Sequence, residues 1–161
     1  MIWGLTISYK DIMNEPNENL ESPVNIARIM IPKVSVAAVH ADDTVRQGLE
    51  IMKYHRYTSI PVLDDQDVYL GSVTEGDFLR HILAVGTTEM KAHEKYRISE
   101  IFRPNFCSPL PIYASLQELI SRSLEQNYVP IVDGRGCMCG IVTRRALILH
   151  LDRTITGEKS E

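Results

Sequence analysis

Hydrophobic and polar positions follow a helical period in one part of this chain and a strand-like pattern in the next. Val45, Leu49 and Met52 are spaced as on the apolar face of a helix. Asp42-Asp43-Thr44 precedes this stripe and supplies polar residues of the kind that begin helices. The pattern therefore predicts an amphipathic helix that begins after Thr44.

A second stripe with the same helical spacing lies in the C-terminal half of the chain. Ser115 is a suitable N-cap for this helix. Its apolar positions are Leu116, Leu119, Ile120 and Leu124. Two amphipathic helices are thus expected, each with one face turned toward a core.

Two short motifs that follow the first helix recur after the second one. The segment Ser59 to Asp65, SIPVLDD, resembles Tyr128 to Gly134, YVPIVDG. The segment Gly71 to Asp77, GSVTEGD, resembles Gly140 to Ala146, GIVTRRA. Both matches have an offset of 69 residues, so an internal repeat explains them better than chance does.

Each copy is expected to contain a short strand, a helix, two strands joined by an Asp/Gly-rich turn, and a closing helix. The first strands are predicted at Val34 to Val39 and at Phe106 to Leu110. The closing helices are predicted at Glu75 to Val85 and at Arg144 to Leu151. Pro61 and Pro130 are placed at the start of the second strand of each copy, where a missing N–H costs little.

The repeat divides the chain into four parts: a polar lead-in (1–25) with one or two helical turns, a first repeat (26–90), a second repeat (91–153) and a polar tail (154–161). A half of roughly 60 residues buries too little apolar surface to be comfortable alone. We therefore expect an α/β (α+β) fold in which two similar halves pack face to face.

Composition and charge exclude several classes of protein. The chain has 161 residues, of which 44% are hydrophobic and 24% charged, with a net charge of −4, so a globular fold is expected and a nucleic-acid partner is not. No apolar run is long enough to cross a membrane, and no signal peptide is recognisable.

Three cysteines, an odd number, indicate a reducing, cytoplasmic compartment. The Cys137-Met138-Cys139 motif has no second ligand pair to complete a metal site.

The order and spacing of three motifs in the first copy, together with the repeat, make the chain resemble a tandem pair of CBS (cystathionine-β-synthase) domains. The motifs are Thr44 to Met52, Ser59 to Asp64 and Gly71 to Asp77, and the resemblance covers about residues 26–153. It implies two βαββα repeats related by a pseudo-twofold axis and packed sheet to sheet, which usually form a flat homodimer.

The same resemblance implies a regulatory role. In this family the clefts between repeats commonly bind adenosine compounds: AMP, ADP, ATP, S-adenosylmethionine or cyclic di-AMP. A chain with no attached enzyme or transporter would be a stand-alone sensor that signals to a regulated partner protein. With its stretch Gly140 to Arg145, GIVTRR, and its overall length, the chain is similar to the small stand-alone bacterial CBS proteins that bind cyclic di-AMP. The second copy departs from the family pattern, because Ala146 replaces the expected Asp.

The start of the first closing helix has two interpretations. Thr74 and Asp77 are spaced as a capping box, in which the threonine caps the helix and the carboxylate reaches back. Alternatively, Asp77 accepts hydrogen bonds from both hydroxyls of a ribose, while Thr74 and free backbone N–H groups meet a phosphate and Gly76 allows close approach. The capping role fits an empty site and the ribose role an occupied one.

The start of the second closing helix places two cations where the helix dipole is already positive. Thr143 is the expected N-cap, and Arg144 and Arg145 fall in the first turn, where cations are disfavoured. We interpret them as a phosphate cradle that an anion makes favourable, so their replacement by Gln should not destabilise the empty protein. The alternative is that both extend into solvent or pair with acids such as Asp133 or Asp152.

An adenine ring would need a dry slot beside these helix starts. Plain core packing is the alternative for Ile60, Val62 and Ile131, and a buried, hydrogen-bonded tyrosine is the alternative for a base-stacking Tyr128. Thr58 and Ser59 could add hydroxyl contacts. Candidate walls in the first copy are Val36, Ala37, Ile60, Pro61 and Val62; those in the second copy are Cys107, Ser108, Tyr128, Val129, Pro130 and Ile131.

Nothing in the sequence indicates an enzyme. The five histidines are scattered, and no nucleophile, phosphate-loop or dinucleotide motif is present. We therefore expect a non-catalytic protein that requires no cofactor and takes an adenine nucleotide as ligand. The alternative is a scaffold protein that keeps the fold but has lost ligand binding.

Overall fold

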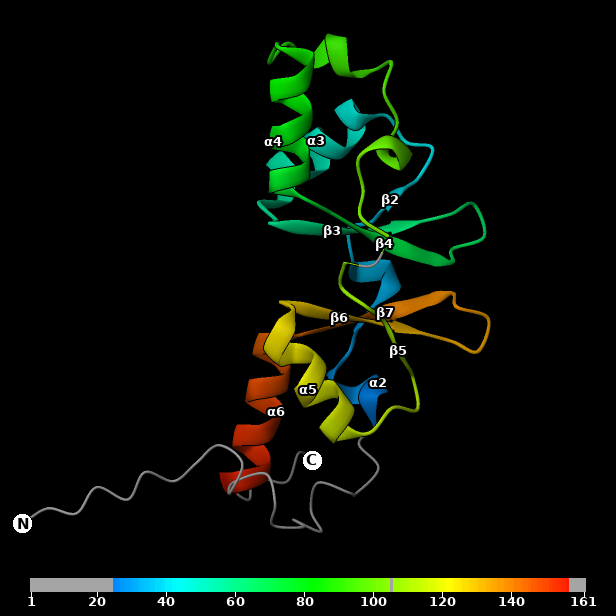
Figure 1. Cartoon of the computed structure of the whole chain (residues 1–161). Coiled ribbons are helices and arrows are strands. Elements are labelled where there is room, and N and C mark those ends of the chain that lie inside the picture. The colour runs from blue at the N-terminus through cyan, green and yellow to red at the C-terminus, as the bar shows by residue number, and fades with distance from the viewer. Residues whose placement is uncertain (1–24, 105, 157–161) are drawn as a thin grey trace, which may run out of the picture.

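The computed structural model describes residues 25–104 and 106–156 (Figure 1). The expected helical turns of the lead-in and the end of the polar tail lie outside the described residues. The elements are, in order, α2 (Ile26–Ile29), β1 (Ile31–Pro32), the 3₁₀ helix η1 (Lys33–Ser35), β2 (Val39–His40), α3 (Val45–His55), β3 (Ser59–Leu63), β4 (Tyr69–Thr74), α4 (Glu75–Val85), the 3₁₀ helices η2 (Met90–His93) and η3 (Ile98–Glu100), β5 (Leu110–Pro111), α5 (Leu116–Glu125), β6 (Tyr128–Val132), β7 (Met138–Thr143) and α6 (Arg144–Thr156).

Two sheets lie against each other in the middle of the molecule, and the helices cover their outer sides (Figure 1). One sheet has the order β2-β3-β4 and carries α3 and α4; the other has the order β1-β7-β6-β5 and lies beside α2, α5 and α6. The two long hairpins also pair with each other at their tips, through a bridge between Val68 and Cys137. This is the α/β fold of two similar halves, packed sheet to sheet, that the repeat predicts.

Both main helices of the repeats begin where the sequence places them. Thr44 caps α3 and Ser115 caps α5, and each forms a reciprocal capping box with the residue three positions later, Gln47 and Glu118. The apolar stripes face the two cores, with the exception of Leu124. That side chain is 62% exposed because it projects from the last turn of α5, so its predicted burial is wrong.

The first strand of each copy is much shorter than predicted. Residues 33–35 form η1, and only Val39–His40 pairs with β3. In the second copy only Leu110–Pro111 pairs, alongside β6. The first halves of β3 and β6 therefore have a neighbour on one side only, β4 and β7. This explains why proline is tolerated at the middle of each strand, and not at its start as predicted.

The segments that lead into the two repeats are exchanged between them. Ile31 and Pro32 pair with β7 of the second repeat, and Ile26 is buried in that repeat's core. In the reverse direction, Ile98 is fully buried in the core of the first repeat. Residues assigned to each repeat by sequence thus complete the core of the other one.

The closing helices agree with the sequence at their N-terminal ends. α4 spans the predicted Glu75–Val85. Its C-cap is Gly86, which adopts the left-handed backbone conformation that glycine favours at the ends of helices. α6 begins at Arg144 but continues to Thr156, five residues beyond the predicted end. Part of the expected polar tail is therefore helical.

Candidate functional site

A cavity of about 240 Å³ opens between the two sheets, at the N-terminal end of α6. It is lined from three directions: by β1 and its connection to β2, by the start of β3 and the residues just before it, and by the start of β6 with the end of β7. None of the lining residues is charged. They are Ile31, Ser35, Val36, Ala37, Tyr57, Thr58, Ser59, Pro61, Asn127, Tyr128, Ile141 and Thr143.

The short β2 is the reason that this cavity exists. Because β2 pairs only with Val62 and Leu63, the first half of β3 has no neighbour on that side. Small side chains border the space, among them Ala37 and Ser59. The Ser59 hydroxyl is buried and has no hydrogen-bond partner among the described residues. A buried hydroxyl without a partner is costly, so Ser59 is a group that a ligand atom could satisfy.

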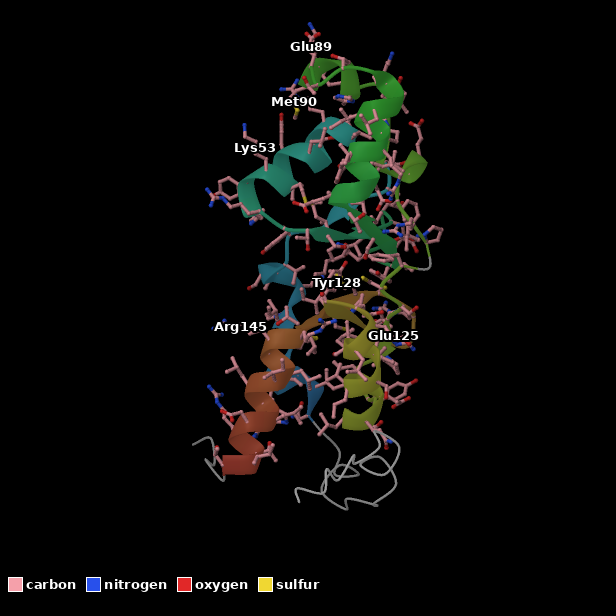
Figure 2. The ribbon with its side chains drawn as sticks, turned by 60° about the vertical axis from the view of Figure 1, so that its left-hand side comes forward. Lys53, Glu89, Met90, Glu125, Tyr128 and Arg145 are labelled. Carbon is pink, nitrogen blue, oxygen red and sulfur yellow. The ribbon has the colours of Figure 1, made fainter. Side chains whose placement is uncertain are left out.

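Tyr128 stands between the sheets as part of the cavity wall, as Figure 2 shows. Its hydroxyl lies 2.5 Å from Ser72 Oγ, which lies 2.9 Å from the hydroxyl of Tyr69. Tyr69 in turn donates to the carbonyl oxygen of Cys107 at 2.7 Å. Burial raises the pKa of both tyrosines above the ordinary range, so both hydroxyls stay protonated and available for hydrogen bonds. The structure thus contains the buried, hydrogen-bonded Tyr128, which also borders the slot, while its stacking on a base stays a prediction.

The start of α6 borders the same cavity through Thr143. The Ala146 amide donates to Thr143 Oγ at 3.1 Å, and the Arg144 amide donates to the carbonyl of Asn127 at 3.0 Å. Among the described residues, the amide of Arg145 has no such partner. Its side chain is exposed, has no ion-pair partner among the residues described, and lies at the end of α6 nearest the sheets (Figure 2).

Unlike the side chain of Arg145, that of Arg144 has hydrogen-bond partners among the described residues. Its Nε donates to the carbonyl of Ser123 at 2.9 Å, and its Nη2 donates to the carbonyl of Gln126 at 3.3 Å. These carbonyls belong to the C-terminal end of α5, where the helix dipole favours a cation. The expectation that both arginines are uncompensated in the empty protein is therefore wrong for Arg144, because α5 supplies its partners.

At the start of α4, the capping interpretation of Thr74 and Asp77 is the one that the structure contains. Asp77 Oδ2 accepts from the backbone N–H of Thr74 at 2.8 Å and from its hydroxyl at 2.6 Å. Asp77 Oδ1 accepts from Arg80 at 2.5 Å and lies 3.2 Å from Nε of Arg103. Burial raises the pKa of Asp77, but the bonds from Thr74 and the two guanidinium groups outweigh it, so the net pKa is below the ordinary value.

The structure brings together seven of the residues predicted to bind or enclose a ligand and leaves the rest elsewhere. Ile60 and Val129 are fully buried in the two cores, where plain packing explains them, and Cys107 is also buried. Pro130 and Ser108 do not line the cavity. Thr74 and Asp77 lie at α4 and not at the cavity. The predicted residues that meet are Val36, Ala37, Thr58, Ser59, Pro61, Tyr128 and Thr143.

The cavity is lined by residues of both repeats, whereas the sequence predicts a separate set of walls for each repeat. Walls from the first copy, such as Ala37 and Ser59, face the helix start of the second copy at Thr143. The two repeats share one cavity because their sheets pack against each other, which brings the edge of β3 opposite the end of β7.

Five lining residues were not predicted. Tyr57 and Asn127 lie next to the predicted residues Thr58 and Tyr128, and Ile141 lies two positions before Thr143, on the same side of β7; these positions carried a usable signal. Ile31 and Ser35 carried none, because their place beside the second repeat depends on the exchange of β1.

The described residues contain no group of three His, Cys, Asp or Glu side chains placed to hold a metal ion. Within the same ranges, no helix has the length and apolar character needed to cross a bilayer.

Comparison with known proteins identifies both repeats. The sequence profile of the CBS domain matches residues 26–84 and residues 99–153. The curated UPF0053 protein YrkA of Bacillus subtilis (strain 168) is 28% identical over 167 residues, which cover 96% of this chain and 37% of that protein. The chain thus spans little more than a third of the length of this relative.

Solved structures show the same fold. CbpB in complex with c-di-AMP superposes with a TM-score of 0.75 at 17% identity, covering 93% of this chain and 99% of that one. CBSX2, an Arabidopsis thaliana protein solved in complex with AMP, superposes with a TM-score of 0.67 at 20% identity, covering 81% and 98%. These likenesses extend over both repeats.

Proposed function

This chain belongs to the CBS domain family, and from that premise we propose that it is a non-catalytic sensor of an adenine nucleotide. The nucleotide would occupy the cavity between the two sheets and alter a surface that a partner protein recognises. Two relatives of the same fold were solved with AMP and with c-di-AMP, which supports this class of ligand.

The observation that carries the proposal is the uncharged cavity that ends at the start of α6. Ligand pockets are mostly apolar and contain a few convergent polar groups. At about 240 Å³ the cavity is somewhat smaller than a typical ligand pocket of roughly 300–1,000 Å³. It would therefore hold the base, between Ala37 and Tyr128, while the phosphate lies at its open end.

Each polar group at the cavity then has a role. The Ser59 and Thr58 hydroxyls would bond the base or the sugar. The Thr143 hydroxyl, the amide of Arg145 and its guanidinium would meet a phosphate, because a helix N-terminus favours an anion. Arg144 could join them only by giving up its bonds to α5.

We also propose that two copies of this chain associate. Leu79 on α4 and Ile148 on α6 are 69 residues apart, so they hold equivalent positions in the two repeats, and they are 57% and 58% exposed. Leu83 and Leu149 extend the same apolar character along the two helices. A second copy would cover both helices at once because the repeats are similar.

A thermal-shift screen tests the ligand proposal with the intact chain. AMP, ADP, ATP, S-adenosylmethionine and cyclic di-AMP would each be added to the protein. A ligand at 100 times its dissociation constant adds about 2.7 kcal/mol to the stability of the folded state. A clear rise in melting temperature with at least one of these compounds is expected.

The second candidate is a scaffold protein that binds no nucleotide. Two observations favour it: Ala146 cannot hold a ribose diol, and Arg144 is already engaged with α5. If none of the five compounds shifts the melting temperature, the scaffold is the better description.

A further inference from the structure

The end of α3 presents two tyrosine rings and three basic side chains to solvent, with Lys53 on the outer side of the helix (Figure 2). Tyr54 is 83% exposed and Tyr57 is 39% exposed. Because large aromatic side chains are mostly buried, two of them beside three basic groups form an unusual surface. We call this surface the α3 platform; its residues are Lys53, Tyr54, His55, Arg56 and Tyr57.

The rings of the α3 platform contact one another. The ring of Tyr57 stacks on that of His55, with 5.1 Å between the centroids and 15° between the planes. The ring of Tyr54 meets that of His55 edge-on, with 4.9 Å between the centroids. Between the two stacked rings, Arg56 ends the helix with a left-handed φ of 55°. A surface that is already ordered loses less conformational entropy when a partner binds to it.

The cations of the platform have no acidic partner among the described residues. Within these ranges, the side chains of Lys53 and Arg56 form neither an ion pair nor a hydrogen bond. Arg46, on an earlier turn of the same helix, pairs with both Glu50 and Glu94. The dipole of α3 favours cations near its C-terminal end, which explains the charges without a partner. It does not explain the two exposed tyrosine rings.

The second repeat has no such platform, so the fold does not require one. With the repeat offset of 69 residues, the positions equivalent to 53–57 are 122–126, at the end of α5. These positions contain one cation, one acid and no aromatic ring. They are Arg122, Ser123, Leu124, Glu125 and Gln126.

The chemistry of the platform fits an acidic polypeptide segment. Carboxylates form charge-assisted hydrogen bonds with Lys and Arg, and tyrosine is enriched at protein interfaces. A nucleic acid fits less well. Asp43 and Glu50 border the same surface depression, of about 340 Å³, as Tyr54 and His55, so an extended chain of phosphates would meet acidic groups there. The net charge of −4 also disfavours a nucleic-acid partner.

We propose that the α3 platform is the docking surface for a short acidic segment of a partner protein. This inference rests on the proposed function, since a sensor needs a surface that its partner recognises. Of the platform residues, Tyr57 lines the cavity between the sheets and the other four do not. The platform therefore reaches the rim of the cavity, but substitutions outside Tyr57 separate docking from nucleotide binding.

Fluorescence anisotropy with the full chain tests the docking surface. The probe is a short, labelled synthetic peptide of glutamate and phenylalanine, and its counterpart has glutamine in place of glutamate. The acidic peptide should bind at least about tenfold more tightly, because only its carboxylates pair with the cations. Lys53→Gln combined with Arg56→Gly should weaken its binding by about tenfold or more, and Tyr54→Ala should weaken it several-fold.

The platform variant is designed to remain folded, and a matched control accompanies it. Glycine suits the left-handed backbone at position 56, so Arg56→Gly should not reduce stability. The control, Arg122→Gln combined with Arg153→Gln, removes the same charge, and Arg122 is the counterpart of Lys53 in the second repeat. The control should bind the acidic peptide as the wild type does. Both double variants should keep any rise in melting temperature that AMP or cyclic di-AMP gives the wild type.

Several results would overturn the docking surface. They are no binding of the acidic peptide by the wild type, equal binding by wild type and platform variant, and tighter binding of a single-stranded oligonucleotide than of the peptide. A changed mass of the platform variant in light scattering would assign the platform to contacts between copies instead. The thermal-shift screen decides nucleotide binding independently: a negative screen with specific peptide binding would leave the platform as the docking surface of a scaffold.

Discussion

At the scale of single residues, Arg144 and Arg145 are adjacent in sequence but have different surroundings. Arg144 bonds two carbonyls at the end of α5, whereas Arg145 is exposed at the start of α6. The dipole of α6 disfavours both cations, but that of α5 favours Arg144. Neighbouring arginines can therefore contribute to stability with opposite signs.

This difference leads to a prediction about stability. Arg144→Gln should lower the free energy of unfolding by about 1 kcal/mol, because two bonds from a charged donor are lost. Arg145→Gln should change it by less than about 0.5 kcal/mol, as is usual for exposed sites. Urea denaturation of the ligand-free protein measures both values. Equal effects of the two substitutions would show that the bonds to α5 contribute nothing.

The buried hydroxyl groups between the sheets give a second prediction. Ser72→Ala should cost about 1–3 kcal/mol, because Tyr128 then keeps a buried hydroxyl without a partner. Tyr128→Phe should cost less, about 1 kcal/mol, since Ser72 retains its bond to Tyr69. Thermal unfolding of the two variants compares them directly. A larger loss for Tyr128→Phe would contradict the hydrogen-bond network described above.

How far residues can be assigned from sequence depends on whether their partners are local. The capping bonds of Thr74 and Asp77 follow from a spacing of three residues, so the sequence predicts them as one of two possibilities. Asp77 and Arg103 are 26 positions apart in the sequence, and Arg144 and Ser123 are 21 positions apart, so each contact joins two different elements of the fold. No pattern within one segment indicates such pairs.

At the scale of elements, η2 is held against α4 by a pair of histidines. His93 is fully buried, and its Nδ1 lies 3.1 Å from Nε2 of His81 on α4. The other ring nitrogen of His93 lies 3.1 Å from the carbonyl of Thr87. Because a carbonyl only accepts, that nitrogen carries a proton, and Nδ1 of a neutral His93 accepts from His81.

This pair predicts a loss of stability in mild acid. Burial and the neighbouring His93 lower the pKa of His81 in the folded protein. As the pH falls through about 6.5, the unfolded chain takes up a proton that the folded chain binds less readily, so the free energy of unfolding falls. The melting temperature should therefore decrease between pH 7.5 and pH 5.5, and His81→Gln should reduce that decrease. An unchanged pH dependence in the variant would exclude His81 as its source.

Helices were predicted more accurately than strands, for a physical reason. The starts of α3, α5, α4 and α6 depend on N-cap residues and stripes within one segment. The lengths of β2 and β5 depend on how far β3 and β6 are covered, which is set by the whole sheet. The shortness of β2, on which the cavity depends, was consequently not visible in the sequence.

At the scale of the whole molecule, the exchange of the first segment of each repeat makes the two repeats depend on each other. Ile26 completes one core and Ile98 the other. The internal repeat predicted two similar halves with opposed sheets, which is confirmed. It did not predict the exchange, because the first segment of each repeat lies outside the two matching motifs.

The exposed apolar residues on α4 and α6 predict a homodimer. Multi-angle light scattering should give about twice the chain mass of 18.3 kDa. Leu79→Lys combined with Ile148→Lys should return the mass to that of one chain, because both equivalent helices then carry a charge. A wild-type chain that is monomeric at all concentrations would contradict the proposed association.

The central claim is that the cavity between the repeats binds an adenine nucleotide, and calorimetric titration of a filled-cavity variant tests it most directly. Ala37→Trp should occupy the space of the base, and Lys53→Trp adds the same side chain on the exposed surface of α3. Wild type and Lys53→Trp should bind AMP or cyclic di-AMP equally well. Ala37→Trp should lose at least about tenfold in affinity, or about 1.4 kcal/mol, while remaining folded. Equal binding by all three proteins, or binding by none, would contradict the claim.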